Sequence, residues 1–255
     1  MEKESVELEE GRARSLPPEW YRPPAHRTVA PPAPTRHETI APMNVVFDLG
    51  AVVVAWEPAR LLQAHFPERA PTAEAAQALA RAFFHHEDWL AFDCGIRSVD
   101  EVVARSASRL GLPETAVHDM IAPLGERLDP IPESIELLDQ LRARRDGGED
   151  VRLYYLSNMP VPYARALERR LPFFQWFDGG VFSGDVKLIK PNSEIYELLA
   201  WRHGFDPAQT LFIDDTAANV EAARALGWRA IHCTAPKALG AQVTRHLAPR
   251  DQPLV

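Results

Sequence analysis

The stretch Val45-Val46-Phe47-Asp48-Leu49-Gly50 places an acid and a glycine directly after a run of apolar residues. An uninterrupted apolar run of this length is typical of a strand that is buried on both faces of a parallel sheet. Two later stretches repeat the arrangement: Leu153-Tyr154-Tyr155-Leu156 before Ser157 and Asn158, and Leu211-Phe212-Ile213 before Asp214 and Asp215. Open α/β sheets bind their ligands at the carboxyl ends of the strands, so these polar groups predict one active site at that edge.

Apolar runs alternate with amphipathic stretches from residue 132 onward, which predicts an α/β fold with a Rossmann-like, doubly wound parallel sheet. The expected strands cover residues 151–156, 181–182, 211–213 and 229–233. The expected helices cover residues 135–144, 164–171, 191–203 and 217–226.

The segment from 59 to 122 differs, because its apolar residues recur only at three- and four-residue spacings. Ser98 with two following acids predicts a helix start, and Gly111 predicts the end of that helix. We therefore expect an α/β core at 44–57 and 131–236 with a helical cap inserted at 58–130. Residues 1–43 are rich in proline and charge and are expected to form a disordered tail. Residues 237–255 are expected to form a C-terminal tail with a short helix.

Composition narrows the possible partners. The net charge of -8 and the lack of a basic stripe argue against nucleic acid. The two cysteines are far apart and predict neither a disulfide framework nor a zinc site. No apolar run is long enough to span a bilayer, and the acidic residues at the start do not resemble a secretory signal. We expect a cytoplasmic protein that contacts no membrane, and its oligomeric state stays open.

Four stretches in order resemble the motifs of the haloacid dehalogenase (HAD) superfamily. They are Phe47-Asp48-Leu49-Gly50-Ala51-Val52, Leu156-Ser157-Asn158, Lys190-Pro191, and Phe212 to Asn219 with Asp214-Asp215. The helical insertion stands where this superfamily carries its type-1 cap. The Asp-Leu-Gly motif is similar to the branch that includes sugar-1-phosphatases and the N-terminal phosphatase domain of soluble epoxide hydrolase.

The resemblance implies a Mg²⁺-dependent phosphatase that acts on a small phosphorylated metabolite through an aspartyl-phosphate intermediate. Asp48 would be the nucleophile, with a pKa kept low by the metal and Lys190. Asp48, Asp215, the Gly50 carbonyl and Asp214 would hold the metal, although Asp214 could instead be the partner of Lys190. Ser157, the backbone amide of Asn158 and Lys190 would bind the phosphate and neutralise its charge.

Gly50 departs from the superfamily pattern, because many of these phosphatases carry a second aspartate there that acts as general acid and base. A substrate with an easier leaving group, such as a sugar 1-phosphate, would need this acid less. Glu57 is a possible replacement, and His85, His86 and Asp93 are the polar cap residues expected to approach the substrate. Lys187 stands where a glycine is common, so it either narrows the pocket or contacts the substrate, or it is a surface lysine.

Two other functions are weighed. The missing acid and the long tail would also suit a HAD-fold regulatory protein that binds phosphate esters without turnover. A metal-independent 2-haloacid dehalogenase would use the same nucleophile, serine and lysine. However, dehalogenases place tyrosine at the position of Gly50 and lack the paired acids, so Asp214-Asp215 favours a phosphatase.

Overall fold

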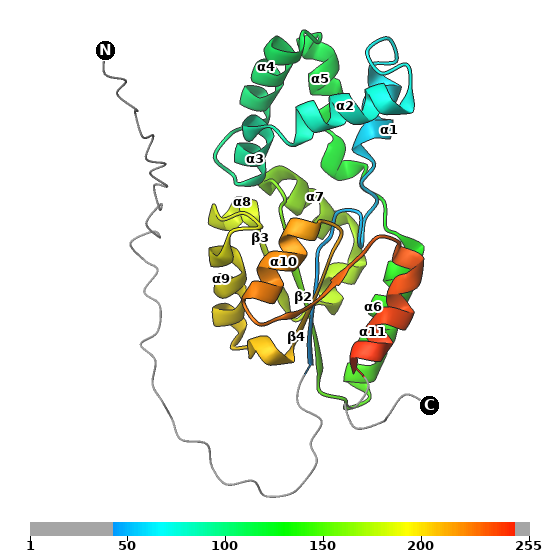
Figure 1. Cartoon of the computed structure of the whole chain (residues 1–255), viewed down its shortest axis with the longest axis vertical. Helices are drawn as coiled ribbons and strands as arrows, with labels where there is room; N and C mark the ends of the chain where they lie inside the picture. Colours follow the sequence, from blue (N-terminus) through cyan, green and yellow to red (C-terminus); the bar gives the residue numbers. More distant parts are fainter. Residues whose placement is uncertain (1–42, 248–255) are drawn as a thin grey trace, which may run out of the picture. The chain divides into compact units, whose positions relative to one another are not determined.

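The computed structural model describes residues 43–247 (Figure 1). The expected N-terminal tail lies outside these residues apart from Met43, and so does the end of the C-terminal tail. Within them, a single parallel sheet has the strand order β3-β2-β1-β4-β5. Its strands are β1 (Met43–Phe47), β2 (Val151–Ser157), β3 (Gly179–Phe182), β4 (Thr210–Asp214) and β5 (Arg229–His232). The predicted α/β class with a parallel, Rossmann-like sheet is confirmed.

Strand β1 lies at the centre of the sheet, with β2 on one side and β4 on the other. The chain continues from β2 to the edge strand β3, and from β4 to the opposite edge strand β5. The order therefore reverses beside β1, which creates the crevice at the carboxyl edge where α/β proteins bind ligands. Asp48 follows β1 directly and so stands in this crevice.

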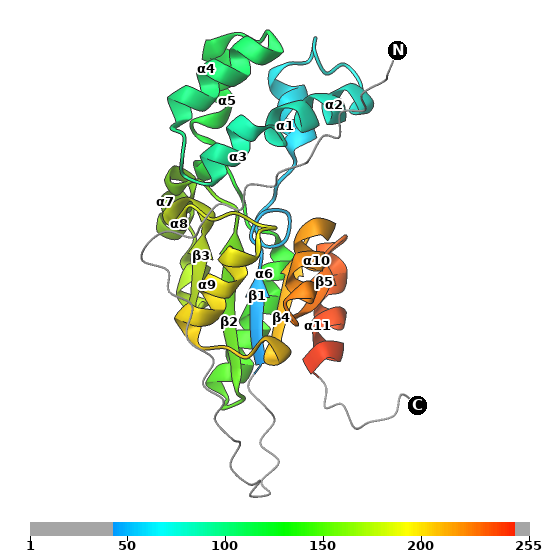
Figure 2. The same ribbon diagram turned by 60° about the vertical axis from the view of Figure 1, so that its left-hand side comes forward.

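Helices cover both faces of the sheet, whose strands are largely apolar and buried (Figure 2). Val45 and Phe47 pack in one buried cluster with α6 (Pro132–Asp146), α7 (Val161–Arg170) and α11 (Leu239–Leu247). Val46, which points the other way, packs with α9 (Ser193–His203) and α10 (Ala217–Ala225). Leu239 and Val243 are buried in the first cluster, so α11 is the expected short terminal helix and belongs to the packed layers.

The segment between β1 and α6 is helical and gathers above one end of the sheet (Figure 1). Its helices are α1 (Pro58–His65), α2 (Ala73–Phe84), α3 (Glu87–Asp93), α4 (Val99–Leu110) and α5 (Glu114–Ile121). We call this segment, residues 58–121, the insertion. Ser98 and Glu101 form the capping box that starts α4, and Gly111 ends it with a φ of 61°.

Close contacts attach the insertion to the sheet layers. The Tyr163 hydroxyl on α7 donates to the Ile121 carbonyl at 2.6 Å. Gly95, after α3, lies so near the short helix α8 (Ser183–Val186) that a Cβ at this position would come 2.3 Å from the Gly184 carbonyl oxygen. One buried apolar cluster runs from Val45 in β1 to Phe92 in the insertion. The position of the insertion above the crevice is therefore set by packing as well as by chain connection.

Several element boundaries differ from those expected. Helix α7 begins at Val161 because Pro160 and Pro162 fit the first turn, where a missing N–H costs nothing. His85 and His86 do not share a helix, since His85 ends α2 and His86 caps α3. Among the helices in residues 43–247, none has the length and hydropathy needed to cross a bilayer. The expectations about cytoplasmic location, membranes and nucleic acid stay predictions, and the oligomeric state stays open.

Candidate active site

Asp48 is held at the crevice by its own backbone. Its N–H donates to the Ile213 carbonyl in β4 at 2.8 Å, which continues the ladder one residue beyond β1. The residue is only 7% exposed. Among the described residues, its carboxylate forms an ion pair with Lys190.

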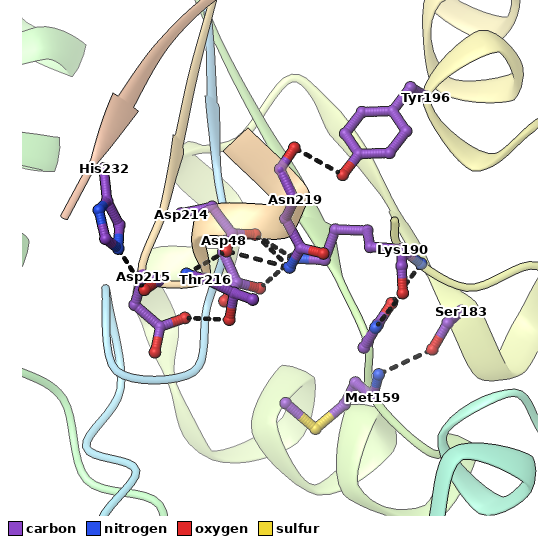
Figure 3. Close-up of polar contacts among 11 residues, drawn as sticks. Asp48, Met159, Ser183, Lys190, Tyr196, Asp214, Asp215, Thr216, Asn219 and His232 are labelled. Carbon is purple, nitrogen blue, oxygen red and sulfur yellow. Dashed lines mark hydrogen bonds and ion pairs between the residues drawn. The ribbon is translucent and has the colours of Figure 1, made fainter. Parts of the chain in front are cut away.

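Lys190 joins the carboxylates that follow β1 and β4 (Figure 3). Its Nζ lies 2.8 Å from Asp48 Oδ1 and 2.6 Å from Asp214 Oδ2. Burial alone would lower the pKa of this ammonium, but Asp214 and Asp48 raise it above its usual value. Lys190 therefore stays charged as a fixed cation between two buried acids.

Asp214 is fully buried and already has several donors besides Lys190. The Asn219 side chain on α10 donates to both carboxylate oxygens, at 3.0 and 3.1 Å, and the Thr216 N–H donates at 2.8 Å. These bonds favour Asp214 as the partner of Lys190 over Asp214 as a ligand of the metal.

The acids suit a divalent cation. Asp48, Asp214 and Asp215 each offer a carboxylate oxygen, and these oxygens lie within 4.8 Å of one another. Such hard oxygen donors are the ligands that Mg²⁺ prefers. Asp215 is partly exposed at the crevice and bonded there only weakly, by the Thr216 hydroxyl at 3.3 Å. Asp48, Asp215 and the Gly50 carbonyl would hold Mg²⁺, with Asp214 supporting Lys190.

The low pKa expected for Asp48 is not produced by the protein groups alone. The pKa of Asp48 is raised to about 7: burial is the largest cause, Lys190 opposes it, and the charges of Asp214 and Asp215 add to the rise. One lysine shared between two buried acids does not offset the loss of hydration. A bound Mg²⁺ would supply the additional positive charge that favours the ionised nucleophile.

Ser157, the last residue of β2, and Asn158, the next residue, line the same cavity as Asp48. The Asn158 side chain accepts from the Lys190 N–H at 2.9 Å and donates to the Lys190 carbonyl at 3.1 Å. Asn158 thus positions the lysine loop, a role that the sequence analysis missed because the two residues are 32 positions apart. Ser157 is buried in the wall of this cavity.

Two expected site residues lie elsewhere. Glu57 has an exposed side chain, pairs with Arg60 at 3.1 Å and lines a different surface hollow, a position that does not support it as the replacement for the missing acid. Lys187 is exposed, ends α8 in the left-handed region at φ 56°, and is not among the residues that line the cavity. The glycine common at this position is explained by that φ, and Lys187 fits the surface alternative. Gly50 does line the cavity.

Some of the polar residues expected from the insertion line the cavity and one does not. His85 and Asp93 line the cavity together with Asp48 and Asp215. His86 instead accepts the Asp88 N–H at 3.2 Å as the cap of α3. Its expected approach to a substrate is therefore not supported.

The wall of the cavity above these acids is strongly apolar. The volume is about 400 Å³, within the range of small-molecule sites. Its apolar lining includes Trp56, Phe84, Trp89, Leu124, Met159 and Tyr163. Trp89 stacks against Trp56 and packs edge-on against Phe84, so the rings form a continuous surface. The sequence signal for these residues was that of an ordinary helical core, and only their convergence shows a cavity wall.

Comparisons with known proteins agree with this geometry. Residues 45–227 match the family model of haloacid dehalogenase-like hydrolases. The sesquiterpene phosphatase astK of Aspergillus oryzae is 27% identical over 74% of this chain and 88% of its own length. A phosphorylated carbohydrates phosphatase of Thermotoga maritima is 31% identical over 42% of this chain and 47% of its own. The structure of a HAD-like family hydrolase from Porphyromonas gingivalis superposes with a TM-score of 0.60 at 27% identity, over 82% of this chain and 98% of that one.

The match covers the crevice residues and both strands that flank β1, and the acids and lysine of all the matched motifs converge in one place. This chain is a hydrolase that belongs to the haloacid dehalogenase-like hydrolase family.

Proposed function

We propose that this hydrolase is a Mg²⁺-dependent phosphatase that hydrolyses a small phosphomonoester through an aspartyl-phosphate on Asp48. The proposal is carried by the buried cluster in which Lys190 pairs with Asp48 while Asp215 faces the crevice. Relatives of this chain are named phosphatases, which supports the same reaction class. We also propose that residues 58–130 act as a cap over a core formed by 44–57 and 131–236.

Each residue of the site would have a role that follows from its position. Asp48 would attack phosphorus, and the P–O bond to the leaving alcohol would break. Lys190 stands beside the attacking oxygen and would stabilise charge that develops on the phosphoryl oxygens. Ser157 and the backbone N–H of Asn158, at the end of β2, would donate to those oxygens and orient the group. Mg²⁺, where bound, screens the repulsion between the nucleophile and the phosphate dianion.

The cavity wall favours an apolar alcohol over the sugar expected from sequence. A sugar carries several hydroxyl groups, and each would lose its hydrogen bonds to water on burial unless the wall replaced them. Above the acids, the wall instead offers aromatic rings and aliphatic side chains, with His85 and Asp93 as its polar members. The name of the Aspergillus relative refers to a hydrocarbon-rich terpene substrate, which is consistent with such a wall. We therefore propose an organic phosphate with an apolar carbon chain as the substrate.

A homologous series of n-alkyl phosphates tests this proposal. Each methylene that leaves water contributes about 0.8 kcal/mol, which corresponds to about a fourfold rise in kcat/KM per carbon until the cavity is filled. We expect hydrolysis to require Mg²⁺, to stop in EDTA and to be abolished in Asp48→Asn. Glucose 1-phosphate should be a poor substrate, and equal or better kcat/KM for it than for octyl phosphate would refute the apolar assignment.

Two further measurements distinguish the phosphatase from the other functions. Saturable binding of octyl phosphate without release of inorganic phosphate would support the binding protein without turnover. Release of chloride from 2-chloropropionate in EDTA would support the dehalogenase. Either result would overturn the phosphatase proposal.

A further inference from the structure

The proposed reaction lacks a proton donor at the usual place. Gly50 has no side chain, and an alkyl alcohol is a poor leaving group unless its oxygen is protonated as the P–O bond breaks. This inference rests on the proposed phosphatase function, because only that reaction needs such a donor. The cavity must therefore supply an acid from another part of the chain.

Among the described residues that line the cavity, Asp93, His85 and Tyr163 are the side chains above the metal-binding acids that carry an acidic proton. The Tyr163 hydroxyl already donates to the Ile121 carbonyl at 2.6 Å. Burial and the nearby Asp93 also raise the pKa of Tyr163 well above its usual value, so it is a weak acid. Tyr163 therefore fits the apolar wall better than proton transfer.

Asp93 is the buried acid that the insertion contributes to the cavity. It is the last residue of α3, is only 9% exposed, and shares the cavity with Asp48 and Asp215. It is near enough to Asp48 and Lys190 for their charges to act on it. Asp93 thus faces the nucleophile from the insertion, on the side of the apolar wall.

The Asp93 backbone is anchored to the phosphate-binding loop. The buried Ser183 hydroxyl donates to the Asp93 carbonyl and accepts the Met159 N–H at 2.8 Å. Met159 directly follows Asn158, so one hydroxyl links α3 to the loop after β2 (Figure 3 shows the Ser183–Met159 part). The carboxyl group itself hydrogen-bonds with the Trp89 side chain, whose indole N–H is a donor. Both the backbone and the side chain of Asp93 therefore have a fixed place relative to the nucleophile.

The surroundings of Asp93 favour its protonated form. Burial raises the pKa of Asp93 well above the usual value; the Trp89 hydrogen bond and Lys190 oppose this rise, and the charge of Asp48 adds to it. Tyr163 and Cys94 are the further titratable groups that its charge affects. Within residues 43–247, no ion pair of Asp93 with a basic side chain is found. The carboxyl group consequently keeps its proton to a higher pH than an exposed aspartate does.

We propose that Asp93 is the general acid and general base of this hydrolase, in place of the side chain missing at Gly50. In the first step an Asp48 oxygen bonds to phosphorus, the bond from phosphorus to the alcohol oxygen breaks, and that oxygen takes the Asp93 proton. In the second step the Asp93 carboxylate takes a proton from water as the water oxygen bonds to phosphorus. The bond from phosphorus to Asp48 breaks, and inorganic phosphate leaves. Asp93 is then protonated again and Asp48 is a free carboxylate.

Asp93→Asn tests this role, because the amide keeps the size and an acceptor for Trp89 but cannot give up a carboxyl proton. The substrates are n-octyl phosphate, whose alkoxide is strongly basic, and 4-nitrophenyl phosphate, whose leaving group needs no proton. We expect turnover of octyl phosphate to fall by about 10²–10⁴-fold. With 4-nitrophenyl phosphate, the first step should survive and the second should slow, giving a burst of about one nitrophenol per site before slow turnover.

Asp100→Asn is the matched control, since it removes an exposed carboxylate of the insertion at the start of α4. It should behave as the wild type with both substrates. The proposal is overturned if Asp93→Asn matches this control on octyl phosphate, or if it slows both substrates equally with no burst. A wild type that hydrolyses neither ester would refute the phosphatase function itself, which is a different result.

Discussion

Replacing Lys190 with methionine removes the positive charge that two buried carboxylates share. The Lys190 side chain is 1% exposed, and those of Asp214 and Asp48 are 0% and 10% exposed. Methionine keeps most of the side-chain volume but leaves both acids without their cation. Breaking a buried ion pair from one side costs about 3–5 kcal/mol, because the remaining charge keeps its desolvation penalty. For a domain of this size we expect Tm to fall by about 6–20 °C.

Urea unfolding followed by circular dichroism measures this loss. It should be smallest below about pH 7, the pKa of Asp48 with Lys190 in place, and should grow as pH rises above that value. Lys190 lowers the pKa of Asp48, so in the variant the carboxyl group keeps its proton to a higher pH and the stabilisation from the paired charge is lost. Lys237→Met is the matched control, since Lys237 is 84% exposed and lies 3.8 Å from Glu133. An exposed pair of this kind contributes about 0–1 kcal/mol.

A double variant isolates the electrostatic part of the stability loss in Lys190→Met. Lys190→Met with Asp214→Asn removes the fully buried acid together with its cation, so it should be more stable than Lys190→Met alone, although still inactive. If the double variant is no more stable than the single one, the loss comes from packing and not from unpaired charge. A Lys190→Met protein as stable as the Lys237→Met control would refute the reasoning entirely.

Three further predictions concern other parts of the molecule. Asp215→Asn should weaken Mg²⁺ binding measured by calorimetry while leaving Tm almost unchanged, and an unaltered affinity would remove Asp215 from the metal site. The folded-state pKa of Asp93 lies above its unfolded value, so the native state holds more protons between the two. The wild type should therefore lose stability relative to Asp93→Asn as pH rises through that window, and parallel curves of unfolding free energy against pH would contradict this. Ser98→Ala should cost about 1 kcal/mol in thermal unfolding, since it removes the N-cap bond of α4, and no change would mean that the cap is not needed.

The location of the crevice residues was predictable because it depends on local pattern and one general rule of topology. Buried parallel strands are recognisable as apolar runs, and their carboxyl ends must meet at one edge. Asp48 and Asp214 each follow or end such a run, so their proximity did not require knowledge of the packing. The position of the Glu57 side chain was not predictable, for the complementary reason. Glu57 lies at the start of α1, where the direction of the backbone points its side chain toward Arg60 and solvent. The position of Glu57 in the sequence does not show this direction.

The amino-acid order alone thus determined the sheet, the helical insertion and the acids that meet beside β1, since local apolar patterns and the shared carboxyl edge of parallel strands were enough to predict them. The tertiary structure alone decided that Trp56, Phe84 and Tyr163 border an open cavity and that Asp93 faces Asp48 across it. An apolar residue has the same sequence signal whether it fills a core or lines a cavity. Only the packing of segments distant in the chain determines whether space remains between them.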